Sequence, residues 1–144
     1  MRIIKKFENF NKQITLYHGT PNDEPNFNDI TSLSTEPSFA MNYGNKLFEI
    51  TIENVNVLDT NNISDCEKII NKFKFLDEGI NGNITNAEEL KSDPYNWRAI
   101  ELTSGVLDWV FSLYDGIWVY EEGVRNLILK TPNNHIVDVE LIDL

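Results

Sequence analysis

The sequence predicts a mixed α+β domain built mostly on antiparallel sheets with flanking helices. Segments rich in β-branched and aromatic residues lie near the start of the chain and again at its end. Segments in which apolar residues recur at helical spacing lie between them. Strands at both ends with helices between them favour antiparallel pairing. Because 41% of the 144 residues are hydrophobic, we expect one core and one domain over 1–144, with 1–11 as a lead-in segment.

The first strands are expected on either side of a polar loop. Residues 14–18 read ITLYH and form a strand candidate that Gly19 ends. The loop at 21–29 contains two prolines. Residues 47–52 alternate apolar and polar side chains like a half-buried strand, and 55–58 continue that strand or pair with it.

A short helix is expected between these strands. At 33–37 a strand end runs into a helical segment. Ser34 or Thr35 is expected to cap this helix, Pro37 suits its first turn and Gly44 suits its end.

Two longer helices are expected in the middle of the chain. Ser64 and Glu67 have the spacing of a capping box, and apolar residues follow at helical intervals, so we expect a helix over 64–76. A second helix is expected over 97–113, although Gly105 weakens its middle.

The end of the chain is expected to be β structure. Strand patterns occur at 117–121, 126–129 and 136–142, separated by short turns. Gly123 between the first two favours a hairpin.

Composition limits the function classes. No apolar run approaches the roughly 20 residues of a membrane span, so we expect no membrane partner. One cysteine, Cys66, excludes an internal disulfide, and with two histidines it disfavours structural zinc and favours a reducing cytoplasm. The net charge of −11 disfavours sequence-independent nucleic-acid binding. It leaves open solubility, a basic protein partner or mimicry of a nucleic acid.

Two clusters of polar residues near the first strands are candidates for chemistry. His18, Gly19 and Thr20 end the first strand, where an imidazole and a closely approaching backbone can meet a ligand. The alternative is a turn with an incidental histidine. Hydroxyls near Ser34 and Thr35 can orient neighbours or bind phosphate at a helix start, the alternative being ordinary capping.

The third cluster lies at the end of a strongly apolar strand. If Ile117, Val119 and Glu121 share one face by strand alternation, Glu121 projects on the core side and Glu122 points to solvent. A carboxylate on the core side needs a partner or a purpose. The alternative is a solvated acidic turn.

Together these motifs resemble the ADP-ribosyltransferase family, in its histidine-bearing branch, from about residue 17 to 129. The order is His-Gly-Thr after the first strand, Ser-Thr before a helix ending in Ala-x-x-Tyr, and Glu at the end of a late strand. The segment from Trp97 through Tyr114 to Glu121 is also similar to small phage-type members, including anti-CRISPR proteins. The Ser-Thr motif stands where the histidine branch usually carries a tyrosine. The resemblance implies a split β-sandwich with NAD+ in its cleft.

The resemblance also implies roles for the first two motifs. His18 would contact the adenosine-side ribose, the Gly19 backbone would pair with the nicotinamide carboxamide, and Thr20 would line the same pocket. Ser34 and Thr35 would support the pocket and the catalytic carboxylate.

The remaining implied roles define the reaction. Tyr43 would stack on nicotinamide, its alternative being a core position, and Glu121 would bind the nicotinamide ribose. Glu122 remains the alternative catalytic carboxylate. The implied function is a mono-ADP-ribosyltransferase that transfers ADP-ribose from NAD+, without a metal, to an acceptor. The expected acceptor is a host protein, as for a phage effector or anti-defence protein in the host cytoplasm. A non-catalytic acidic inhibitor on the same fold, an NAD+ glycohydrolase and phosphate transfer on RNA are the alternatives.

Overall fold

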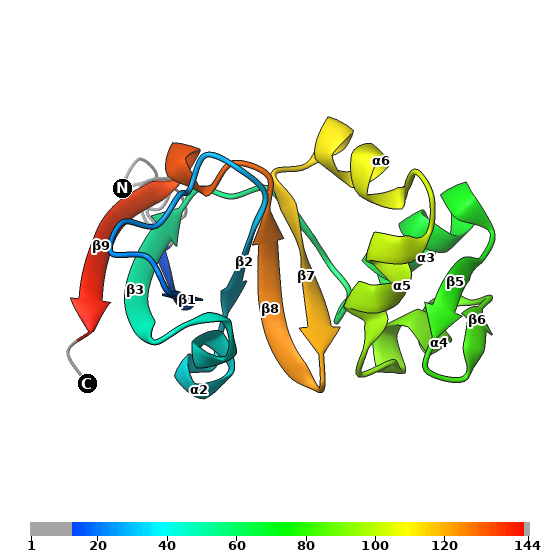
Figure 1. The fold of residues 1–144 in the computed structure, drawn as a ribbon. Coiled ribbons are helices and arrows are strands. Elements are labelled where there is room, and N and C mark those ends of the chain that lie inside the picture. The colour runs from blue at the N-terminus through cyan, green and yellow to red at the C-terminus, as the bar shows by residue number, and fades with distance from the viewer. Residues whose placement is uncertain (1–12, 143–144) are drawn as a thin grey trace, which may run out of the picture. The chain divides into compact units, whose positions relative to one another are not determined.

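The computed structural model describes residues 13–142 and is mixed α+β, with mostly antiparallel strand pairs and several helices (Figure 1). The expected lead-in at 1–11 lies outside the described residues. The chain divides into two compact units, one running up to Asn56 and resuming at Leu129, the other spanning Val57–Ile128. A single domain over 1–144 stays a prediction. Within 13–142, the helices are too short or too polar to cross a bilayer.

The first unit contains an antiparallel sheet in the order β2-β1-β3-β9. Its strands are β1 (Gln13–Thr20), β2 (Thr31–Ser34), β3 (Lys46–Glu53) and β9 (Ile136–Ile142). The strands expected at 14–18, 47–52 and 136–142 are confirmed. Leu16, Ile50 and Ile52 are fully buried, as the alternation of apolar residues requires.

The helix after β2 is shorter than a regular helix and is not capped as expected. It consists of α2 (Pro37–Ala40) and the 3-10 turn η1 (Met41–Tyr43), followed by Gly44. Glu36 is the N-cap residue, and the described residues provide no side-chain cap bond there. The expected capping by Ser34 or Thr35 is therefore wrong, because the helix begins only at Pro37. Pro37 in the first turn and Gly44 at the end are confirmed.

The second unit contains the strands β4 (Val57–Asp59), β7 (Gly116–Glu121) and β8 (Val124–Leu129), in the order β4-β7-β8. β4 pairs with β7 in parallel, so the expectation that 55–58 continues or pairs with the strand at 47–52 is wrong. Glu122 and Gly123 connect β7 to β8 with φ angles of 48° and 76°. Positive φ at both turn residues is the mark of a type I′ hairpin, which confirms the predicted turn.

The helices of the second unit differ from the prediction in three ways. α3 (Ile63–Phe73) is capped by Asn62, whose side chain accepts a hydrogen bond from the Asp65 amide at 3.1 Å, so the Ser64 capping box is wrong. Leu76, expected at the helix end, begins a strand. The expected helix over 97–113 is two helices, because the helical conformation is interrupted between Leu102 and Val106, where Gly105 has a φ of 85°.

Three elements of this unit were not expected: the paired strands β5 (Leu76–Gly79) and β6 (Gly82–Ile84), and the helix α4 (Ala87–Ser92). The two helices that replace the expected one are α5 (Asn96–Leu102) and α6 (Val106–Leu113). Figure 1 shows these helices grouped with α3 and with the β5–β6 pair. Their apolar faces share a core with one face of β7 and β8, formed by Leu58, Ile69, Ile100, Val110, Ile117, Val119 and Ile128 among others.

A buried polar network joins this helical layer to β7. The Thr60 hydroxyl donates to the Trp118 carbonyl at 2.8 Å. Asn96 is fully buried, donates to Thr60 Oγ1 at 3.1 Å and to the Leu90 carbonyl at 3.0 Å, and accepts from the Tyr120 amide at 2.8 Å. These bonds fix the backbone of β7 immediately before Glu121.

Candidate functional site

The end of β1 lies directly against the α2–η1 segment. A Cβ on Gly19 would stand 1.8 Å from the Ala40 carbonyl oxygen and 2.6 Å from its carbonyl carbon. A Cβ on Gly44 would stand 2.2 Å from the Thr20 carbonyl carbon and 2.3 Å from the Pro21 nitrogen. Two glycines therefore let residues 40–44 pack closely over the end of β1. The space on the Cβ side of Gly19, where a close approach was predicted, is filled by the backbone of Ala40.

His18 precedes this contact and is held as a neutral ring. Its Nδ1 lies 3.4 Å from the Ser32 carbonyl oxygen, and its ring meets the Phe27 ring edge-on, with centroids 5.3 Å apart. Because a carbonyl only accepts, Nδ1 carries the proton and Nε2 is left as an acceptor. Burial lowers the pKa of His18 by more than the Ser32 hydrogen bond raises it. Neutral His18 can thus accept a hydrogen bond from a ligand hydroxyl through Nε2.

The hydroxyls of Thr20 and Ser34 are buried and shape the two strand ends. Thr20 Oγ1 accepts from the Asn22 amide at 3.2 Å, and Ser34 Oγ accepts from the Glu36 amide at 3.1 Å. Tyr17 and Ser34 are register partners, which sets the end of β2 beside β1. The structure therefore brings Ser34 close to the end of β1 and gives both hydroxyls a role in turns.

Thr35 and Tyr43 are the exposed members of the predicted set in the first unit. Thr35 follows β2 directly. The Tyr43 side chain is 55% exposed and rests edge-on against Phe39, with ring centroids 6.0 Å apart. Tyr43 is therefore not a core residue.

Glu121 and Glu122 belong to the second unit and differ in their surroundings. Ile117 and Val119 are buried in the core, as strand alternation predicts, and Glu121 is the next residue on that face. Its carboxylate is half-buried and accepts from Asn126 Nδ2 at 3.3 Å. Glu122 is exposed in the hairpin turn. The alternation is confirmed, while the catalytic role of either carboxylate stays a prediction.

Asn126 is a neighbour of Glu121 that the sequence reasoning missed. Its side chain is fully buried, and within the described part of the chain its Oδ1 has no hydrogen-bond partner. The available signal was the hairpin register, because a two-residue turn at 122–123 places residues 121 and 126 on the same face.

Arg125, on the opposite face of β8, was also missed and is tied to a carboxylate. Its two terminal nitrogens each lie 2.8 Å from an oxygen of Asp59, and its guanidinium lies 4.3 Å above the Trp118 ring. Burial raises the pKa of Asp59, but the hydrogen bonds from Arg125 and the Asn61 amide outweigh it, and the net shift is downward. This pair links β8 to β4 across β7.

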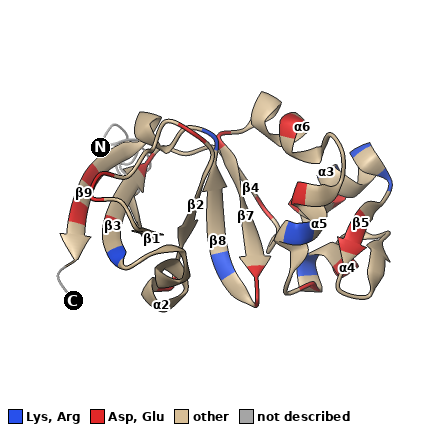
Figure 2. Cartoon of the chain, in the orientation of Figure 1, with Lys and Arg blue, Asp and Glu red and all other residues tan. Residues whose placement is uncertain are grey.

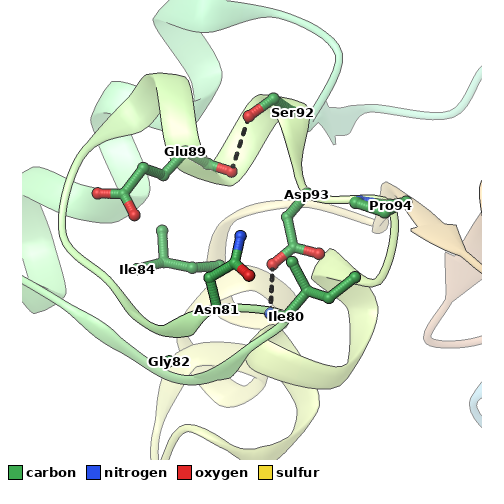
Figure 3. A pocket seen from close by; sticks show the side chains of 8 residues that line it. All are labelled: Ile80, Asn81, Gly82, Ile84, Glu89, Ser92, Asp93 and Pro94. Atoms are coloured by element: carbon green, nitrogen blue, oxygen red, sulfur yellow. Dashed lines mark hydrogen bonds between the residues drawn. The ribbon is translucent and has the colours of Figure 1, made fainter.

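A cavity of about 310 Å³ lies elsewhere in the second unit, between the β5–β6 turn and α4 (Figure 3). Its buried carboxylate, Asp93, accepts from the Ile80 amide at 2.9 Å and the Tyr95 amide at 2.8 Å. Asp93 thereby holds the turn of the strand pair to the loop before α5. The sequence-predicted site residues are not among those that line this cavity. Across 13–142, no group of three or more His, Cys, Asp or Glu side chains is placed to hold a metal ion.

Comparisons with known proteins give one likeness of fold. No protein-family model matches the chain, and no curated protein is significantly similar to it in sequence. A solved structure described as the crystal structure of an anti-CRISPR protein is similar, with a TM-score of 0.50 over 92% of this chain and 98% of that one. The two sequences are 15% identical, so the likeness is one of fold.

Proposed function

We propose that this chain is a mono-ADP-ribosyltransferase of the phage anti-defence type, which transfers ADP-ribose from NAD+ to a host protein. The observation that carries the proposal is the clustering of motif residues in the first unit. A neutral histidine, two buried hydroxyls and an exposed tyrosine lie at or next to the place where residues 40–44 close over β1. The likeness of fold to an anti-CRISPR protein supports the anti-defence part.

In this proposal the first unit binds the dinucleotide. His18 Nε2 accepts a hydrogen bond from a ribose hydroxyl, and the main chain at Gly19 pairs with the carboxamide of nicotinamide. Thr20 and Ser34 keep the two strand ends in shape, with Thr35 beside them. The exposed ring of Tyr43 stacks on the nicotinamide ring.

Glu121 is the proposed catalytic carboxylate. Breaking the bond between the nicotinamide nitrogen and the ribose C1′ releases nicotinamide and builds positive charge on the sugar. A fixed carboxylate beside that sugar stabilises the charge as it develops. Glu121 fits this role better than Glu122, because Glu121 is half-buried and hydrogen-bonded at a strand end, whereas Glu122 lies in an exposed turn. The acceptor nucleophile then attacks C1′ and completes the transfer.

The matched pair Glu121→Gln and Glu122→Gln tests the assignment of the carboxylate. We expect Glu121→Gln to lower transfer from labelled NAD+ by about 100-fold or more, the usual loss for a preorganised electrostatic group, with NAD+ affinity nearly unchanged. Glu122→Gln should retain the wild-type rate. The reverse ranking would move the role to Glu122, and full activity in both variants would reject a catalytic carboxylate on this hairpin.

The role of His18 is tested by binding rather than rate. His18→Ala should weaken NAD+ binding measured by calorimetry, because it removes the acceptor at Nε2. Unchanged affinity would count against this role. Incubating a host lysate with labelled NAD+, followed by mass spectrometry, would identify the modified protein. Free ADP-ribose formed without an acceptor would instead indicate NAD+ hydrolysis.

A non-catalytic acidic inhibitor is the second candidate, and the charge of the chain favours it. The net charge is −11, and carboxylates are spread over elements of both units, including β9 and β5 (Figure 2). Such a surface suits a basic protein partner. Thermal unfolding separates the two candidates, since a ligand that binds only the folded chain must raise its apparent stability. No stabilisation at millimolar NAD+ would favour the inhibitor.

A further inference from the structure

We infer that Asn126 is a positioning residue for Glu121, present for the reaction rather than for stability; this inference rests on the proposed function. Asn126 Nδ2 donates to Glu121 Oε1 at 3.3 Å. A carboxylate oxygen only accepts, so this bond fixes the orientation of the amide and turns Oδ1 away from Glu121. Asn126 Nδ2 therefore hydrogen-bonds the carboxylate, whereas Asn126 Oδ1 has no hydrogen-bond donor among the described residues.

The cost of this arrangement is visible in the burial of Asn126. Its side chain is fully buried, and a buried acceptor without a partner destabilises the folded state. The surrounding positions on this face of the hairpin, Val119 and Ile128, are apolar core residues. An apolar side chain of the same branching, such as leucine, would avoid the unpaired oxygen. An amide that costs stability and contacts a proposed catalytic carboxylate is the pattern expected where function opposes stability.

Asn96 provides the matched contrast in the same unit. It is also fully buried, yet its amide makes three hydrogen bonds, donating to Thr60 and Leu90 and accepting from Tyr120. Removing it would take a hydrogen-bond partner from each of these three groups. Asn96 is thus a structural asparagine. Asn126 differs from it because its Oδ1 has no hydrogen-bond partner among the described residues and because its donor contacts the Glu121 carboxylate.

The test compares Asn126→Leu, Asn126→Asp and Asn96→Leu by thermal unfolding and by steady-state NAD+ turnover. Asn126→Leu keeps the number and branching of the side-chain heavy atoms and removes the donor and the unpaired oxygen together. We expect its melting temperature to be unchanged or higher, its kcat to fall by about 10- to 100-fold from loss of orientation, and its KM for NAD+ to change little. Asn126→Asp replaces the donor by an acceptor beside Glu121 and should lose at least as much kcat. Asn96→Leu should lower the melting temperature by roughly 5 °C or more.

A double variant separates positioning from a general effect. If Asn126 acts through Glu121, adding Asn126→Leu to Glu121→Gln should cause no further loss of rate. A multiplied loss would overturn the inference, as would an Asn126→Leu protein that melts early like Asn96→Leu or keeps full kcat. In each of these cases an active wild type would leave the proposed function standing. A wild-type chain that neither transfers nor hydrolyses NAD+ would overturn the proposed function and this inference with it.

Discussion

Replacing Gly19 by alanine is the most direct test of how the first unit is packed. The new Cβ would lie 1.8 Å from the Ala40 carbonyl oxygen, whereas non-bonded heavy atoms at carbon rest at about 3.5 Å. The obstacle is backbone, so no rotamer change relieves it, and residues 40–44 would have to move away by more than about 1 Å. Overpacking of this severity costs about 3 kcal/mol, the upper end of the usual range. We therefore expect Gly19→Ala to lower the melting temperature by roughly 10 °C in a circular-dichroism scan.

Gly123→Asn is the matched control for this prediction. Across the described residues, nothing lies within 4 Å of a Cβ added at Gly123, and asparagine tolerates its φ of 76°. It should therefore unfold within a few degrees of wild type. A Gly19→Ala protein as stable as the control would refute the contact between β1 and the α2–η1 segment. The grouping of motif residues on which the proposed function rests would fall with that contact.

Three further predictions concern stability. Burial lowers the pKa of His18 in the folded state, so on acidification the unfolded state binds a proton at a higher pH than the folded state does. The stability contributed by the neutral ring is therefore complete above about pH 6.5 and is lost as the pH falls below that value. His18→Gln should flatten this part of the stability–pH curve measured by thermal unfolding. The pKa of Asp59 is also lowered, so its contribution is present above about pH 4 and lost in acid; Asp59→Asn should cost about 1 kcal/mol at pH 7 in urea unfolding and much less near pH 2, whereas an equal cost at both values would contradict a charged pair with Arg125. Asn62→Ala should cost about 1 kcal/mol in the same assay through loss of the α3 cap and Ser64→Ala much less, and the opposite order would restore the capping box.

The fold could be predicted where a pattern is local. Strand alternation at 47–52 and 117–121 and the glycine turn at 123 depend on neighbouring residues alone, and these elements are confirmed. The errors arise where several local solutions compete. Asn62 and Ser64 both suit a helix start, and only the packed position of α3 decides between them. Residues 55–58 carry a strand pattern, but the pattern does not specify the partner, which is β7 in parallel.

The candidate site follows the same division. Strand parity was sufficient to separate Glu121 from Glu122, because alternation fixes which residue follows Val119 on the core face. It was not sufficient to find Asn126, which depends on the pairing of β8 with β7. The sequence also could not predict that Ala40 fills the space beside Gly19, because a loop and a strand separate these two residues along the chain.

The Asn96 network also has a consequence for the edge of the sheet in the second unit. β4 ends at Asp59, opposite Trp118, while β7 continues to Glu121, so β7 outruns its parallel neighbour. Beyond that point the ladder positions of β7 would be open to a strand from another chain. The Trp118 carbonyl accepts from both the amide and the hydroxyl of Thr60, and the Tyr120 amide donates to Asn96, so the polar groups of β7 remain paired beyond the end of β4. Two buried polar residues thereby leave these backbone groups of β7 no free valence for a strand of another molecule.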